Sequence, residues 1–239
     1  MYFHDPMYLL LMVVGMALVF VPQMWVKNTF ARFSEVRTSR GMSGRQVAQV
    51  ILGEHGLSQV SVEMVDGELS DHYDPGERVV RLSPEVYNGS SISSVAVAAH
   101  ECGHAIQHAK GYYPVVLRSA MVPAVNLGSN LGPLLIMGAA MLGAFSHAAP
   151  SLSVSLAWVG VILYSLAVAF HFVTLPVELD ASGRALKVLE SHSYLTREEM
   201  GGAKSVLTAA AFTYIASALY ALMQLMYYVF RLLGSRRDD

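Results

Sequence analysis

Four long stretches of this sequence contain no Asp, Glu, Lys or Arg, and they constrain the fold more than any other feature. They cover residues 7–26, 119–146, 151–173 and 205–230. A helix needs about 20 apolar residues to cross the hydrocarbon core of a bilayer, and each stretch is long enough. We therefore predict four transmembrane helices. The first is expected to be a retained anchor rather than a signal peptide, because no Lys or Arg precedes it.

The composition excludes several other classes of protein. Only 14% of the 239 residues are charged and 54% are hydrophobic, whereas about a quarter of the residues of a soluble domain are charged. Cys102 is the only cysteine, so the chain cannot form an intramolecular disulfide. The net charge of −2 gives no reason to expect a nucleic-acid partner. The partners expected are membrane lipid and a protein substrate.

The basic residues predict the orientation of the chain in the membrane. Two spans separate the polar segments 27–118 and 174–204, so both segments lie on one side, while residues 147–150 make only a tight turn. The two segments carry nine and four Lys and Arg residues, against three in the tail. By the positive-inside rule the polar segments are cytoplasmic and both termini lie outside.

The expected fold is mainly α, a polytopic membrane protein with a small α+β cytoplasmic domain that contains a short sheet. The predicted parts are an anchor (1–26), the cytoplasmic domain (27–118), two spans (119–173), a cytoplasmic helical segment (174–204) and the last span with the tail (205–239). Within the cytoplasmic domain, Ser43 can cap a helix over residues 43–54. Residues 60–65 and 78–82 are predicted strands, with a turn at residues 74–76 between them. A further helix runs from the serines at 90–94 to about Ala109.

That last helix carries the pattern HExxH. Two histidines four positions apart lie one helical turn apart on one face, so His100 and His104 can bind the same metal ion. Glu101 projects beside the metal, where it can take a proton from a water activated by zinc and later give it to a leaving amine. The opposite face is apolar and predicted to pack on a core; its residues are Val95, Ala99, Cys102 and Ile106.

A zinc site needs a third protein ligand. His108 lies eight residues from His100, about 12 Å along a helix, which is too far for both to share one ion. The second cytoplasmic segment offers Glu178 and Asp180, which lie about 200° apart on a helix and cannot both face the metal. We favour Glu178. Asp180 is left to pair with Arg184 or to support a ligand histidine.

The local structure around this acid is also predicted. Thr174 can cap, and Pro176 can open, a new helix as the third span leaves the bilayer. In that case Glu178 and Asp180 have an alternative role, which is to complement the positive end of the helix.

These motifs together resemble the YugP-type membrane zinc metallopeptidases. The segments that carry the resemblance are SDHYDPGERVVRLSPEVY, HECGHAIQH and LPVELDASGRAL. That family is in turn similar to gluzincin peptidases, including those of the Ste24 and HtpX type. The resemblance implies a zinc-dependent endopeptidase of the bacterial cytoplasmic membrane with a zincin-like domain and an active site facing the cytoplasm. It also implies one zinc ion held by His100, His104 and Glu178, with Glu101 as the catalytic acid and base.

The resemblance departs from the gluzincin pattern at one position. Gluzincins usually place an Asp four residues after the ligand Glu, where it supports a histidine, and this chain has Ser182 there. Either Asp180 takes the supporting role through another geometry, or Glu178 is not the ligand.

Gluzincins bind a peptide along the edge of a sheet beside the metal helix, and two sets of residues follow from that comparison. The strand Arg78, Val79, Val80, Arg81, Leu82 is either that edge or an internal strand. The candidates for stabilising the transition state are His72, Tyr73, His192 and Tyr194. His171, near the inner end of the third span, is either a partner of the site or an interfacial histidine.

A second class of function is kept open at this stage. A non-catalytic membrane protein that binds or transports metal would also need His100, His104 and an acid. It would not need a base at position 101, which favours the peptidase.

Overall fold

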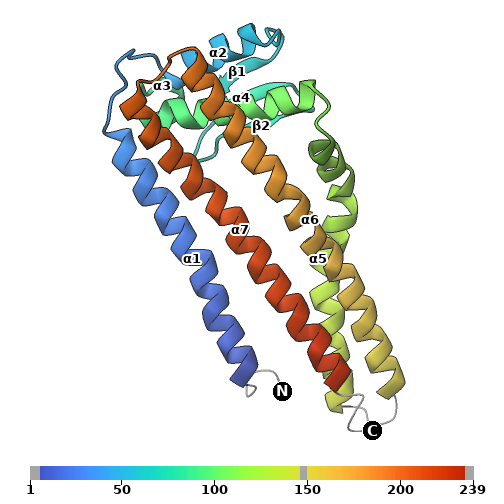
Figure 1. Cartoon of the computed structure of the whole chain (residues 1–239). Coiled ribbons are helices and arrows are strands. Elements are labelled where there is room, and N and C mark those ends of the chain that lie inside the picture. Colours follow the sequence, from blue (N-terminus) through green and yellow to red (C-terminus); the bar gives the residue numbers. More distant parts are fainter. Residues whose placement is uncertain (1–5, 146–149, 235–239) are drawn as a thin grey trace. The chain divides into compact units, whose positions relative to one another are not determined.

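The computed structural model describes residues 6–145 and 150–234, and it is mainly helical (Figure 1). The predicted turn at residues 147–150 lies outside the described residues except for Pro150. In chain order the elements are α1 (Pro6–Ser34), α2 (Gly44–Glu54), β1 (Ser61–Met64), β2 (His72–Asp74), β3 (Val79–Leu82), α3 (Pro84–Asn88), α4 (Ile92–Ala109), α5 (Tyr113–Phe145), α6 (Pro150–Ser191) and α7 (Arg197–Gly234).

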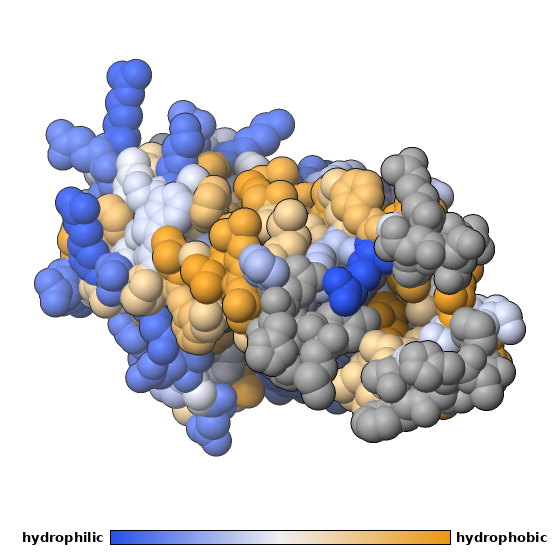
Figure 2. All heavy atoms as spheres, turned by 90° about the horizontal axis from the view of Figure 1, so that it is seen from below, coloured by the Kyte–Doolittle hydropathy of each residue, from blue (hydrophilic) through white to orange (hydrophobic). Residues whose placement is uncertain are grey.

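As predicted, four helices of the described chain are long and apolar enough to cross a membrane. They are α1, α5, α6 and α7, each with an 18-residue window of high mean hydropathy, from 1.4 to 2.2. These helices expose large apolar side chains such as Leu10, Ile162 and Phe230, and Figure 2 shows apolar side chains gathered on the visible surface. Exposed apolar surface of this extent is expected where lipid is the solvent.

The structure corrects the prediction that Thr174 and Pro176 begin a new helix. Both residues lie inside α6, which continues without interruption from Pro150 to Ser191. Proline has no N–H, so Pro176 removes one hydrogen bond, to the carbonyl four residues earlier. The other hydrogen bonds of a 42-residue helix outweigh that loss. Glu178 therefore stands within a helix rather than at a helix start, and its role is not to complement a helix dipole.

The chain forms two compact units. One contains residues 1–20, 117–174 and 214–239, and the other contains residues 21–116 and 175–213. In the first, α5 and α6 pack through small residues: a Cβ on Gly132 would lie 2.9 Å from the backbone nitrogen of Tyr164. Close helix contacts at glycines are typical of membrane helices.

The second unit holds a three-stranded sheet in the order β1-β3-β2. β1 is parallel to β3, and β2 is antiparallel to it. The prediction that residues 78–82 form a substrate-binding edge is therefore wrong, because β3 is the central strand and both of its edges are already paired. The strand β2 was not predicted, since three residues are too few to show an alternating pattern. The turn at residues 74–76 joins β2 to β3, not the two predicted strands.

Helix α4 forms the centre of this unit. Its predicted core residues Val95, Ala99, Cys102 and Ile106 are all at most 3% exposed, which confirms the amphipathic interpretation. They pack with α2, whose start is fixed by the predicted cap: Ser43 accepts a hydrogen bond from the Gln46 backbone, and the Gln46 side chain accepts one in return. This capping box satisfies backbone groups at the first turn of α2 and fixes where the helix begins.

Helices α4 and α6 approach each other closely at Gly103. A Cβ built on Gly103 would lie 2.6 Å from the backbone oxygen of Ala181. No ordinary side chain fits at that distance, so the approach requires glycine. Because Gly103 lies inside the HExxH segment, this contact brings α6 next to the two histidines.

We expect Gly103→Ala to destabilise the protein by about 1–3 kcal/mol, because the added methyl group forces the two helices apart. Chemical denaturation of the full chain in detergent micelles measures the change. Gly53→Ala is the matched control, since Gly53 is a helical glycine with no atom within 4 Å of a built Cβ. That substitution should be neutral or stabilising by up to about 1 kcal/mol. Equal stability of the two variants would contradict the close packing of α4 on α6.

Candidate metal centre

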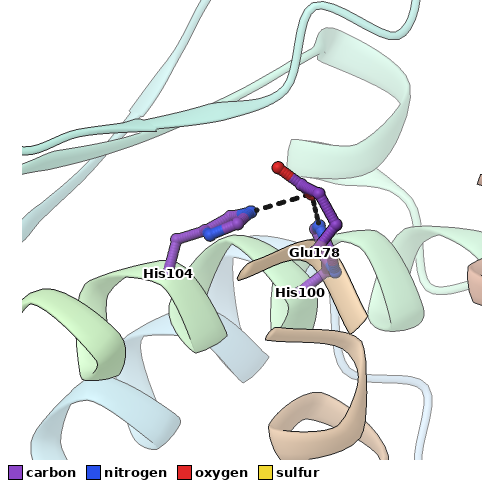
Figure 3. Close-up of side chains that lie close together, drawn as sticks. All are labelled: His100, His104 and Glu178. Carbon is purple, nitrogen blue, oxygen red and sulfur yellow. Dashed lines mark ion pairs between the residues drawn. The ribbon is translucent and has the colours of Figure 1, made fainter. Parts of the chain in front are cut away.

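Three side chains from two helices converge on one point in the second unit. His100 and His104 extend from α4, and Glu178 extends from α6 between them (Figure 3). The Oε2 atom of Glu178 lies 3.4 Å from the Nε2 atom of each histidine. All three potential ligand atoms lie within 4.8 Å of one another. The structure thus brings together the three residues that the sequence predicts as metal ligands.

The donor set fits zinc. Imidazole nitrogen and carboxylate oxygen bind Zn²⁺ at about 2.0–2.2 Å, so two ligands of a tetrahedral site lie about 3.3 Å apart. The 3.4 Å separations from Glu178 to the two histidines match that edge length. Three protein ligands leave one position of a tetrahedral site open, as in catalytic rather than structural zinc sites. Among the described residues, this is the one group of His, Cys, Asp and Glu that could hold a metal ion.

A buried glutamine fixes the orientation of His104. The Gln107 side chain is fully buried, and its amide nitrogen donates to the backbone oxygen of Val177 and to Oδ2 of Asp180, both at 2.8 Å. Its amide oxygen therefore faces Nδ1 of His104, at 3.1 Å. An amide oxygen only accepts, so Nδ1 of His104 carries a proton, and Nε2 is the nitrogen that faces Glu178 and becomes a ligand when a metal displaces its proton.

Ser182 holds His100 in the same way. Its hydroxyl lies 3.1 Å from Nδ1 of His100. When the hydroxyl accepts from that nitrogen, Nε2 is left to bind a metal. Ser182 stands four residues after Glu178, where gluzincins have the supporting Asp. From the sequence, this serine was only a departure from the gluzincin pattern and had no role. Its position four residues after Glu178 was the feature that could have indicated one. Gln107 was also missed, although it lies three residues after His104.

Asp180 faces away from the metal ligands. It accepts hydrogen bonds from Gln107 and from Nε of Arg184, the latter at 2.5 Å. Both roles expected of it are present at once: it pairs with Arg184, and it supports His104 through Gln107. Glu178 and Asp180 thus lie on different faces of α6, as their 200° separation predicts.

Glu101 is buried, with 7% of its surface exposed. Burial by itself would lower the pKa of His104, but the hydrogen bond with Glu178 and the negative charges of Glu101 and Glu178 outweigh it and raise that pKa. Burial also raises the pKa of Asp71, and the charge of Glu101 adds to this effect. Glu101 is therefore within electrostatic reach of a ligand histidine. Because a metal must displace the proton of His104, metal binding weakens as the pH falls.

The other candidate residues lie in different surroundings. Tyr73 on β2 packs its ring against His108, 5.5 Å away between centroids, and His108 follows His104 by one turn of α4. His72 is exposed and contacts the backbone of Ser70. His192 and Tyr194 both contact Glu54. His171 belongs to the first unit and is not in the metal-binding group.

Comparisons with known proteins point in the same direction as this geometry. The sequence pattern of a family described as "putative neutral zinc metallopeptidase" matches residues 8–233. The chain is 42% identical to the "putative membrane protease YugP" of Bacillus subtilis, over 98% of this chain and 100% of that protein. No solved structure matches the chain.

We expect Ser182→Ala to weaken zinc binding by about 10- to 100-fold, the usual effect of losing a partner of a ligand histidine. Glu178→Ala removes a ligand and should have the larger effect. Zinc affinity is measured on the purified chain by competition with a chromophoric chelator.

Ser205→Ala is the control for Ser182→Ala, because the Ser205 hydroxyl bonds only to the carbonyl of Gly201 in its own helix. It should bind zinc as the wild type does. Full zinc affinity in Ser182→Ala would show that this hydroxyl does not orient His100.

Proposed function

Because the chain belongs to the putative neutral zinc metallopeptidase family, we propose that it is a zinc-dependent membrane endopeptidase with a zincin-like catalytic domain. The observation that carries the proposal is the meeting of two imidazoles and one carboxylate, whose oxygen lies 3.4 Å from each Nε2 atom. The contacts of Gln107 and Ser182 support it further, since each occupies Nδ1 of an imidazole and leaves Nε2 to face the metal.

The proposed reaction divides the work between the metal and Glu101. Zinc held by His100, His104 and Glu178 would make a water molecule acidic enough to lose a proton near neutral pH. Glu101 accepts that proton on its carboxylate while the water oxygen attacks the scissile carbonyl carbon. The Glu101 carboxyl group then gives the proton to the amide nitrogen as the C–N bond breaks. Its burial favours both transfers, because competing water is excluded.

The sheet suggests where a peptide substrate lies. With β3 in the centre, the remaining edge near the metal helix is β2, which packs against α4 through Tyr73 and His108. An extended peptide could pair with the free edge of β2 through main-chain hydrogen bonds. Burial raises the pKa of Tyr73, so its hydroxyl stays protonated at neutral pH and can donate to a developing oxyanion. A peptide or membrane-protein segment is the substrate class that this edge accommodates.

A non-catalytic protein that binds or transports metal is the competing function. It accounts for the three ligands equally well. It gives no role to a buried carboxylate at position 101, whose burial costs free energy without a metal or proton nearby. Sensitivity of the function to Glu101 therefore separates the two proposals.

Glu101→Gln should abolish peptide hydrolysis while zinc stays bound, because the amide keeps the shape of the side chain but cannot accept the proton. Loss of a general base lowers kcat by about 10²- to 10⁴-fold. Cleavage of an unfolded protein substrate and zinc content are measured on the same preparation. Glu190→Gln, at an exposed position of α6, is the control and should retain both. Hydrolysis by Glu101→Gln at the wild-type rate would eliminate the mechanism.

The proposed orientation places the metal centre in the cytoplasm of a bacterial cell. A Cys102→Ser background allows single cysteines to be introduced at exposed positions. Asp66→Cys in the second unit should react with a membrane-impermeant maleimide only after lysis. Ser151→Cys, at the start of α6, should react in intact cells. The reverse pattern would place the site outside and invert the topology.

A further inference from the structure

The second unit contains a cavity that is separate from the metal ligands. It has a volume of about 460 Å³, which lies in the range of small-molecule sites, about 300–1,000 Å³. It lies between the end of α4 and the last turns of α6. The charged residues around it are Lys110, Asp180, Arg184 and Lys187.

The charge of this cavity is positive. Asp180 is the one acid in its lining, and Arg184 already pairs with it. Lys110 and Lys187 form no ion pair with any described residue. Two uncompensated ammonium groups beside a guanidinium therefore face the same space. Like charges repel, so an anion in the cavity would relieve an unfavourable interaction.

The chemistry and size of the cavity indicate an organic phosphate. Lysine ammonium groups bind phosphate as point charges, and a guanidinium adds paired hydrogen bonds. A bare inorganic ion would fill only a small part of the volume. The apolar side chains of Ile106 and Val188 also line the cavity, so it offers a contact surface for a carbon skeleton next to the phosphate site.

The positions on α6 separate this cavity from the metal centre. Arg184 and Lys187 lie six and nine residues after Glu178, which places them about 240° and 180° around the helix from it. The cavity residues thus occupy the opposite face of α6. A ligand bound there would not touch the metal or its ligands.

A chain of hydrogen bonds nevertheless connects the two sites. Arg184 donates to Asp180, Asp180 accepts from Gln107, and Gln107 faces Nδ1 of His104. A phosphate that draws Arg184 away leaves more of the negative charge of Asp180 for Gln107. A more strongly polarised Gln107 oxygen makes His104 a more basic ligand.

We propose that the cavity lined by Lys110, Arg184 and Lys187 is a regulatory site for a phosphate group, and that its occupancy strengthens zinc binding through Asp180 and Gln107. The phosphate belongs either to a soluble organic phosphate or to the headgroup of an anionic phospholipid. The phosphate site does not depend on the proposed peptidase function. The effect of phosphate on zinc affinity does rest on that proposed function.

Binding is tested on the full, metal-free chain in phosphatidylcholine nanodiscs. In one arm sn-glycerol 3-phosphate is titrated and heat is measured by calorimetry. In the other, nanodiscs that also contain phosphatidylglycerol are compared by thermal denaturation. The double variant Lys110→Ala/Lys187→Ala removes two exposed lysines and should weaken binding about tenfold or more. Lys204→Ala, an exposed helical lysine outside the cavity, should bind as the wild type does.

The outcomes separate the two sources of phosphate. Saturable binding of glycerol 3-phosphate that the double variant loses supports a soluble ligand. Stabilisation by phosphatidylglycerol alone, again lost in the double variant, supports a lipid headgroup. Binding in neither arm, or equal binding by the double variant, overturns the proposal.

The connection to the metal is tested by zinc affinity with and without the ligand that binds. We expect the ligand to tighten zinc binding about fivefold or more in the wild type. In the double variant the ligand should leave zinc affinity unchanged, and this variant also controls for zinc that the phosphate binds in solution. Unchanged zinc affinity overturns the regulatory role. A wild-type chain that binds phosphate but no zinc would instead contradict the proposed peptidase.

Discussion

The contact between Gly103 of α4 and the backbone of Ala181 in α6 is the constraint on which the metal centre depends. The histidines and the carboxylate are 74 or more positions apart in sequence, and each helix alone offers an incomplete ligand set. Only a glycine lets the backbones come close enough for Glu178 to reach between two imidazoles on the facing turn. The same approach places Gln107 within hydrogen-bond distance of Val177. Packing and ligand geometry are therefore set by one contact.

Around this contact, buried polar groups are matched to one another. A fully buried glutamine is costly unless its donors and acceptor are all used, and Gln107 uses both donors and its oxygen. This requirement determines which nitrogen of His104 carries the proton. Ser182 contacts Nδ1 of His100 in the corresponding position, and its hydroxyl can accept from that nitrogen. The polar core of the unit thus prepares the two imidazoles to act as neutral ligands.

Helix α6 contributes to both the metal centre and the basic cavity, because different residues lie on its two faces. Glu178 and Ser182 lie one turn apart and face α4 and its histidines. Asp180 and Arg184 lie on the other side, where Arg184 borders the basic cavity. Asp180 is the residue shared between them, since it contacts both Gln107 and Arg184.

The sequence by itself determined the four apolar helices, the cap and core of α2 and α4, and the ligand histidines, because each depends on the spacing of residues within one helix. It also showed that only one of Glu178 and Asp180 can be the third ligand, since residues two apart cannot face the same point; the structure groups Glu178 with the histidines. Only the tertiary structure decided the central position of β3, the existence of β2, and the roles of Gln107 and Ser182. The three residues of β2 are too few to show an alternating pattern, and the place of β3 depends on its pairing with both neighbours. Gln107 and Ser182 act on partners 70 and 82 residues away, about which local periodicity carries no information.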